Sequence, residues 1–119
     1  MKEPRKQLGQ EAELLAEEFL RGRGLEIIEK NVFFKFGEID LVARDGDTIV
    51  FVEVRSRTRP DIHPAATITR TKQQHIVRAA EAYLQRHRLT DIMARFDVVT
   101  VCTSSGQIEY FPNAFEAGR

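Results

Sequence analysis

Three charged side chains interrupt a strongly apolar stretch at residues 37–55, which reads GEIDLVARDGDTIVFVEVR. Its β-branched and apolar residues predict a β-hairpin with a turn at residues 44–47. Asp40 lies in the first predicted strand, whereas Glu53 and Arg55 lie in the second. Because side chains alternate across a strand, Glu53 and Arg55 share one face.

The turn of this hairpin decides which acidic side chains meet. If the chain folds about residues 46–47, Asp40 lies opposite Glu53. If it folds about residues 45–46, Glu38 lies opposite Glu53, and Asp40 belongs to the next pair on the same face of the hairpin. Both turns keep Asp40 and Glu53 on one face, whereas a three-residue turn breaks this parity unless a bulge restores it.

Two carboxylates that face each other on a sheet repel by a fraction of ~1 kcal/mol, so something must offset the repulsion. A divalent cation does so, and Mg²⁺ is typically bound by one or two carboxylates plus substrate phosphate. Asp40 and Glu53 therefore indicate a metal site, with Arg55 as a neighbouring cation. The alternative is an edge hairpin with solvated charges and an Asp–Arg pair across the strands, and the spacing leaves both interpretations open.

Length and composition narrow the class of protein. A chain of 119 residues predicts a single domain, residues 1–119, with a modest core. The lone cysteine, Cys102, argues against a disulfide framework and against a zinc site. The first ten residues lack an apolar segment and no run reaches membrane-spanning length, so we expect a cytoplasmic protein without a membrane partner.

The charge is unevenly distributed along the chain. A net charge of zero argues by itself against strong nucleic-acid binding. Residues 55–88, however, hold eight basic and only two acidic residues. Such a block can hold a polyanion, and a solvated loop and helix face is the alternative. Within it, the candidates for nucleic-acid binding are Arg57, Arg59, Arg70 and Lys72.

The hydrophobic pattern predicts the element order α-β-β-β-α-β-β. The expected elements are a helix at residues 8–21 after a frayed start at 1–7, a strand at 25–34, the hairpin at 37–55, a helix at 71–88, and strands at 96–102 and 108–111, the last ended by Pro112. The long connection through the second helix allows strand 96–102 to lie parallel to a hairpin strand, which predicts an α/β fold with a mixed sheet.

Two residues of the predicted helices are candidates for the site. Glu13 falls just beyond the apolar stripe of the first helix and can reach towards a sheet face, although an exposed carboxylate is the alternative. Lys72 lies in the first turn of the second helix, where a capping box of Thr71 and Gln74 is expected. That end of a helix favours an anion, so Lys72 indicates a phosphate partner or is simply solvated.

The loop at residues 56–68 is long for a compact domain, and such loops are often functional. It contains His63. This histidine is either an acid–base group or phosphate ligand, or an ordinary surface residue, and the sequence leaves both interpretations open.

Four stretches of the chain closely resemble the YraN family of small bacterial proteins: GQEAELLAEEFL, GEIDLVARDGDTIVFVEVRSR, TRTKQQ with AAEAYL, and RFDVV. The resemblance covers about residues 8–115. The family is similar to the PD-(D/E)xK nucleases and, in layout, to archaeal Holliday-junction resolvases. It implies a restriction-endonuclease-like domain, with a central mixed β-sheet flanked by helices.

The resemblance also implies roles for individual residues. The superfamily's first-helix glutamate corresponds to Glu13, its hairpin aspartate to Asp40, and its E-x-K pair to Glu53 and Arg55. Asp40 and Glu53 would bind Mg²⁺ or Mn²⁺, with the backbone carbonyl of Val54 as a further ligand. Arg55 stands where lysine is usual; it can stabilise charge on a phosphate but is less suited to helping deprotonate a water.

Three functions follow as hypotheses. The first is a metal-dependent nuclease that hydrolyses phosphodiester bonds, with branched DNA rather than RNA as substrate and a homodimer needed for resolvase-like cutting of two strands. The second is a nucleic-acid-binding module that kept this fold and lost the chemistry. The third is an interaction protein that binds a protein partner through the hairpin face or the loop at residues 56–68.

Overall fold

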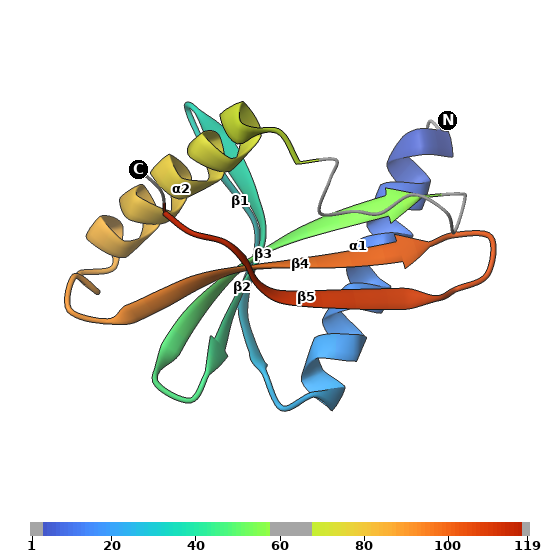
Figure 1. The fold of residues 1–119 in the computed structure, drawn as a ribbon, viewed down its shortest axis with the longest axis horizontal. Coiled ribbons are helices and arrows are strands. Elements are labelled where there is room, and N and C mark those ends of the chain that lie inside the picture. The colour runs from blue at the N-terminus through green and yellow to red at the C-terminus, as the bar shows by residue number, and fades with distance from the viewer. Residues whose placement is uncertain (1–3, 58–67, 118–119) are drawn as a thin grey trace.

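Figure 1 shows the computed structural model, which describes residues 4–57 and 68–117. The order of its helices and strands is the predicted α-β-β-β-α-β-β. The elements are α1 (Pro4–Gly22), β1 (Glu26–Phe34), β2 (Gly37–Asp45), β3 (Thr48–Arg57), α2 (Arg70–Arg86), β4 (Met93–Cys102) and β5 (Ile108–Phe115).

The described strands form one mixed sheet in the order β1-β2-β3-β4-β5. Neighbouring strands are antiparallel except β3 and β4, which pair in parallel through the crossover that contains α2. The predicted α/β class and the mixed sheet are therefore confirmed. The parallel pair lies at the centre of the sheet, where both faces are covered.

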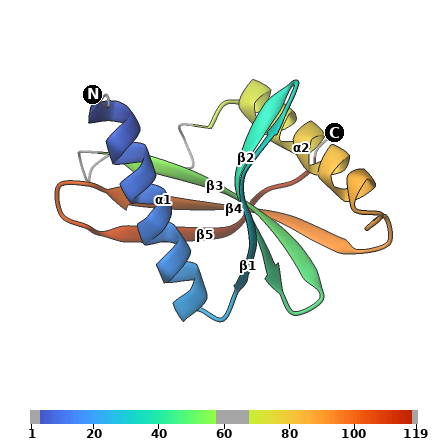
Figure 2. The ribbon, with the colours of Figure 1, turned by 180° about the vertical axis from the view of Figure 1, so that it is seen from behind.

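The two helices cover opposite faces of the sheet. Figure 2 shows α1 lying across β3, β4 and β5, whereas α2 lies beside the β1–β2 hairpin. Each face has its own hydrophobic cluster: α1 packs with Leu41, Val50 and Val52, and α2 packs with Val42, Ile49 and Phe51. Among the described residues, no helix is both long enough and apolar enough to cross a membrane.

Both helices begin at residues other than those predicted. Helix α1 starts at Pro4, so residues 4–7 are helical where a frayed start was expected; proline is well suited to the first helical turn. Helix α2 starts at Arg70, because its cap is Thr69 and not Thr71. The Thr69 Oγ1 accepts a hydrogen bond from the Lys72 backbone N–H at 3.1 Å.

The prediction that Pro112 ends the last strand is wrong, because β5 continues to Phe115. Proline is tolerated on an edge strand, and here the pairing of β5 with β4 changes register across it. The carboxylate of Asp97, which is fully buried, holds this irregular segment. It accepts hydrogen bonds from the Asn113 N–H at 2.8 Å, from the Tyr110 hydroxyl, and from the Arg95 Nε.

We expect Asp97→Ala to lower the free energy of unfolding by roughly 3 kcal/mol, since it leaves the Asn113 N–H and the Tyr110 hydroxyl without their buried acceptor and leaves Arg95 with Asp45 alone. Urea denaturation followed by circular dichroism measures the change. Asp91→Ala, at an exposed aspartate before β4, is the matched control. A loss for Asp97→Ala no larger than that of the control would show that the buried cluster adds nothing to stability.

Candidate active site

The hairpin between β2 and β3 folds about residues 46–47, which is the first of the two predicted turns. Arg44 pairs with Ile49, and the ladder runs as far as the pair Leu41 and Val52. One further step of the same register places Asp40 opposite Glu53. The sheet therefore brings together the two acidic residues that the sequence pattern singled out.

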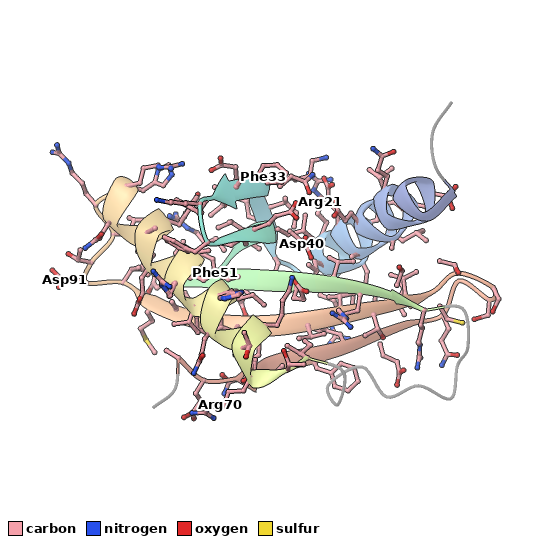
Figure 3. All side chains as sticks on the ribbon, turned by 90° about the horizontal axis from the view of Figure 1, so that it is seen from above. Arg21, Phe33, Asp40, Phe51, Arg70 and Asp91 are labelled. Carbon is pink, nitrogen blue, oxygen red and sulfur yellow. The ribbon has the colours of Figure 1, made fainter. Side chains whose placement is uncertain are left out.

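Asp40 lies where β2 separates from β3 (Figure 3). Its Oδ2 accepts a hydrogen bond from the backbone N–H of Val54 at 2.8 Å, so the side chain takes the place of a backbone partner. Leu41 packs in the cluster below α1, whereas Ile39, two residues away, packs in the cluster below α2. The alternation of side chains between the two faces of β2 is therefore interrupted at Asp40. The Asp40 carboxylate points towards β3, where it meets the Val54 N–H.

Glu53 is almost completely buried, with 7% of its surface exposed. Its carboxyl group is hydrogen-bonded to that of Asp40. Two cations flank it: the Lys72 Nζ lies 3.7 Å from Glu53 Oε2, and the Arg55 Nη1 lies 3.9 Å from the same atom. Lys72 was predicted as a contact to nucleic acid, and the structure places it beside the carboxylate pair.

Burial makes it unfavourable for both carboxyl groups to be ionised. Burial and then the charge of Asp40 raise the pKa of Glu53 to about 8, against the opposing effect of Lys72 and Arg55. Burial also raises the pKa of Asp40, although the Val54 N–H favours its ionised form. The pair therefore retains a proton near neutral pH unless a cation neutralises it.

Glu13 approaches Asp40 from the α1 side. Burial raises the pKa of Glu13, and the negative charge of Asp40 raises it further, which shows that the two carboxylates interact. A hydrogen bond to the Asn31 side chain lowers the pKa of Glu13 and holds it over β1. Glu13 also lines a pocket of about 220 Å³ that contains Lys30.

Glu38 is a fourth acidic residue near the pair, which the sequence analysis weighed only for one turn. Burial raises its pKa, as does the charge of Asp40, and Lys72 lowers it. Its position two residues before Asp40 in GEID is the signal that could have identified it. Among the described residues, however, no three acidic, histidine or cysteine side chains are close enough to form a complete metal site.

The other predicted basic residues lie in different settings. Arg57 forms an ion pair with Glu109 and its side chain is only 7% exposed, which argues against it as a phosphate contact. Arg70 is exposed at the start of α2, two residues before Lys72. Arg59 and His63 lie outside the described residues, so their predicted roles are not tested.

The raised pKa of Glu53 predicts how stability depends on pH. The folded protein binds this proton more tightly than the unfolded chain, whose glutamate pKa is 4.5. The stabilisation that the protein gains from protonated Glu53 is therefore complete below about pH 4.5 and is lost as the pH rises through about 8.

We expect the free energy of unfolding to fall between about pH 5 and pH 8.5 in the absence of divalent metal, and Glu53→Gln to flatten this slope. The variant should be the more stable protein at the upper pH by at least about 1.4 kcal/mol, the equivalent of one pKa unit. Urea titrations at several pH values measure it, with Glu18→Gln on the exposed face of α1 as control. Equal slopes for wild type and Glu53→Gln would contradict the assignment.

Comparison with known proteins gives a consistent result over nearly the whole chain. The model of the family described as "Uncharacterised protein family UPF0102" matches residues 12–101, a range that includes Glu13, Asp40, Glu53 and Arg55. A UPF0102 protein of Geobacter metallireducens is 47% identical over 115 residues, covering 93% of each chain. One from Alkalilimnicola ehrlichii is 52% identical over 99 residues, covering 82% of this chain and 79% of the relative.

A third relative, a UPF0102 protein of Coxiella burnetii, is 46% identical over 111 residues and covers 92% of each chain. Identity at this level, over this much of the chain, establishes common descent and a shared fold. The resemblance to the YraN family is confirmed, because that family and UPF0102 are the same. This protein belongs to the UPF0102 family.

Proposed function

We propose that this protein is a nuclease that hydrolyses phosphodiester bonds in DNA with the help of Mg²⁺ or Mn²⁺ held by Asp40 and Glu53. The observation that carries the proposal is the contact between the buried carboxyl group of Glu53 and the half-buried one of Asp40, with Lys72 and Arg55 beside Glu53. A purely structural pair would be better satisfied by one acidic residue and one amide, because two carboxyl groups in contact must either retain a proton near neutral pH or repel each other.

The donor set fits these two metals. Both carboxyl groups offer hard oxygen atoms, and Mg²⁺ commonly takes one or two carboxylates and completes its shell with water and phosphate. Glu13 is a candidate for positioning water, because it interacts with Asp40 from the opposite side to Glu53. The Val54 carbonyl remains a predicted ligand, while the Val54 N–H orients Asp40. When bound, the ion would neutralise charge on the scissile phosphate and acidify a water molecule.

The cations of the site hold and stabilise the phosphate. Lys72 carries a compact charge at the N-terminal end of α2, where the helix dipole also favours an anion. Arg55 carries a planar guanidinium that can donate two parallel hydrogen bonds to phosphate oxygens. Together they supply the positive charge that the lysine of the E-x-K pair supplies in the nucleases that this family resembles.

Purified protein incubated with Mn²⁺ and labelled branched or single-stranded DNA should cleave the strand, and Glu53→Gln should reduce the rate by about 100-fold or more, because it removes a metal ligand. Glu18→Gln is the matched control, since it makes the same change on the exposed face of α1. Gel electrophoresis of the products measures the rate.

Calorimetry gives a readout that does not depend on cleavage. Wild type should release heat on titration with Mn²⁺, and Asp40→Asn should not. Absence of heat with wild type would rule out the metal site. Metal binding and DNA binding without cleavage would instead favour the second hypothesis, a nucleic-acid-binding protein that has lost the chemistry; the absence of a three-acid metal group among the described residues is the observation in its favour.

Lys72→Gln provides a separate test of the cation. Because Lys72 lowers the pKa of Glu53, its removal should raise that pKa above about 8. If metal binding requires ionised Glu53, the cleavage rate of Lys72→Gln should then increase with pH over a higher pH range than that of wild type. The maximal rate should fall about tenfold or more through loss of charge at the phosphate. NMR titration of the glutamate carboxyl carbons measures the pKa. An unchanged pKa for Glu53 would show that Lys72 does not act on this group.

A further inference from the structure

Beside α2, two stacked aromatic rings of the β1–β2 hairpin lie between two guanidinium groups of the helix. The rings of Phe34 and Phe36 lie parallel, with centroids 6.1 Å apart. The Arg78 guanidinium lies 4.6 Å from the Phe36 centroid, and that of Arg86 lies 4.5 Å from the Phe34 centroid. We call these four residues the stacking ladder. Its two ends are planar cations on exposed residues.

The ladder is built on rigid parts of the fold. Phe34 ends β1 and Phe36 lies in the turn before β2, and both are half-buried against the hydrophobic cluster below α2. The hairpin tip stands beside the N-terminal half of α2 (Figure 1). A Cβ atom added at Gly37 would come within 3.2 Å of the His75 carbonyl oxygen, so the tip lies directly on the helix backbone. Little ordering is needed before a ligand binds.

The chemistry of the ladder suits unpaired nucleobases. Because each ring is covered by the other ring and by a guanidinium, the planar surfaces that remain for a base are the outer faces of Arg78 and Arg86. Bases stack on the flat face of arginine independently of sequence, and the same guanidinium can contact a phosphate. A cavity of about 560 Å³ opens beside Phe36 and Arg78, and Gln85 adds an amide that can donate to and accept from a base edge. Lys35, which is exposed between the two rings in sequence, adds positive charge, and Glu81 is an acidic residue in the cavity lining. With Arg78 and Arg86, three cations outnumber this one carboxylate, so the surface keeps a net positive charge that suits a polyanion.

The ladder lies near the carboxylate pair along α2. Lys72 and Arg78 are six residues apart, which corresponds to about 9 Å along the helix axis and about 120° around it. Glu38, which interacts with Lys72, follows Phe36 by two residues. A strand whose phosphate lies at Lys72 therefore meets the ladder after a short distance. A duplex keeps its bases stacked on one another and cannot use such a surface.

We propose that the stacking ladder of Arg78, Phe36, Phe34 and Arg86 binds the unpaired bases of single-stranded DNA and directs that strand to the site at Asp40 and Glu53. This inference rests on the proposed function for its substrate, and it specifies that the substrate has a single-stranded segment next to the bond that is cut. The alternative role of the ladder is to fix the hairpin tip on α2, which involves no DNA.

The test measures fluorescence polarisation of a labelled oligo-dT of about 15 nucleotides and of a duplex of equal length, at about 50 mM salt. It uses the Glu53→Gln protein without divalent metal, so that cleavage plays no part. Arg78→Lys with Arg86→Lys keeps both charges and removes both planar groups. Arg44→Lys, at an exposed arginine at the far end of β2, is the matched control.

We expect the double lysine variant to bind oligo-dT about tenfold more weakly and the duplex less than twofold more weakly, whereas Arg44→Lys changes neither by twofold. Thermal melting verifies that each variant is folded, and Arg78→Lys alone repeats the test if the double variant is not. Unchanged affinity for oligo-dT, equal losses on both probes, or no binding of oligo-dT by the parent protein would each overturn the inference.

The outcome is separable from that of the proposed function. Binding of oligo-dT through the ladder without any metal-dependent cleavage would refute the nuclease and leave the ladder standing. Metal-dependent cleavage of DNA that does not depend on the ladder residues would support the nuclease and refute the role of the stacking ladder.

Discussion

The contact between the carboxyl groups of Asp40 and Glu53 is the interaction on which the site depends. Glu53 is buried and Asp40 is half-buried, so water screens their repulsion poorly, and the pair either shares a proton or neutralises its charge with a cation. The Val54 N–H fixes one member, and Lys72 and Arg55 flank the other. The arrangement concentrates oxygen ligands beside two cations, which is the physical basis for our proposal of a metal and a phosphate there.

The rest of the fold supports this contact from both faces of the sheet. The pairing of β2 with β3 sets the register and ends just before Asp40, while α1 brings Glu13 from one face and α2 brings Lys72 from the other. The buried Asp97 cluster holds β5 against β4 at the opposite edge from β1. Site residues on strands and helices are held more accurately than residues on loops, as catalysis requires.

Helix α2 joins the two surfaces that we propose for nucleic acid. Its first turn carries Lys72 at the carboxylate pair, and its later turns carry Arg78 and Arg86 over the rings of the β1–β2 hairpin. Charge along the sequence did not distinguish these arginines from Arg57, which is neutralised by Glu109. What separates them is their neighbours: an aromatic face leaves a guanidinium its charge, whereas a carboxylate cancels it.

The sequence by itself determined the element order and the α/β class, and it placed Asp40 and Glu53 on one face of the hairpin for either two-residue turn, because strand alternation and turn parity are local properties of the chain. It could not choose between the two turns, and it ended β5 at Pro112, where an edge position and the Asp97 carboxylate allow the strand to continue. Only the tertiary structure decided that Lys72 lies beside Glu53 and that Arg78 and Arg86 stack on the hairpin. Those contacts depend on how the crossover packs α2 against the sheet, and no periodicity of the chain encodes that packing.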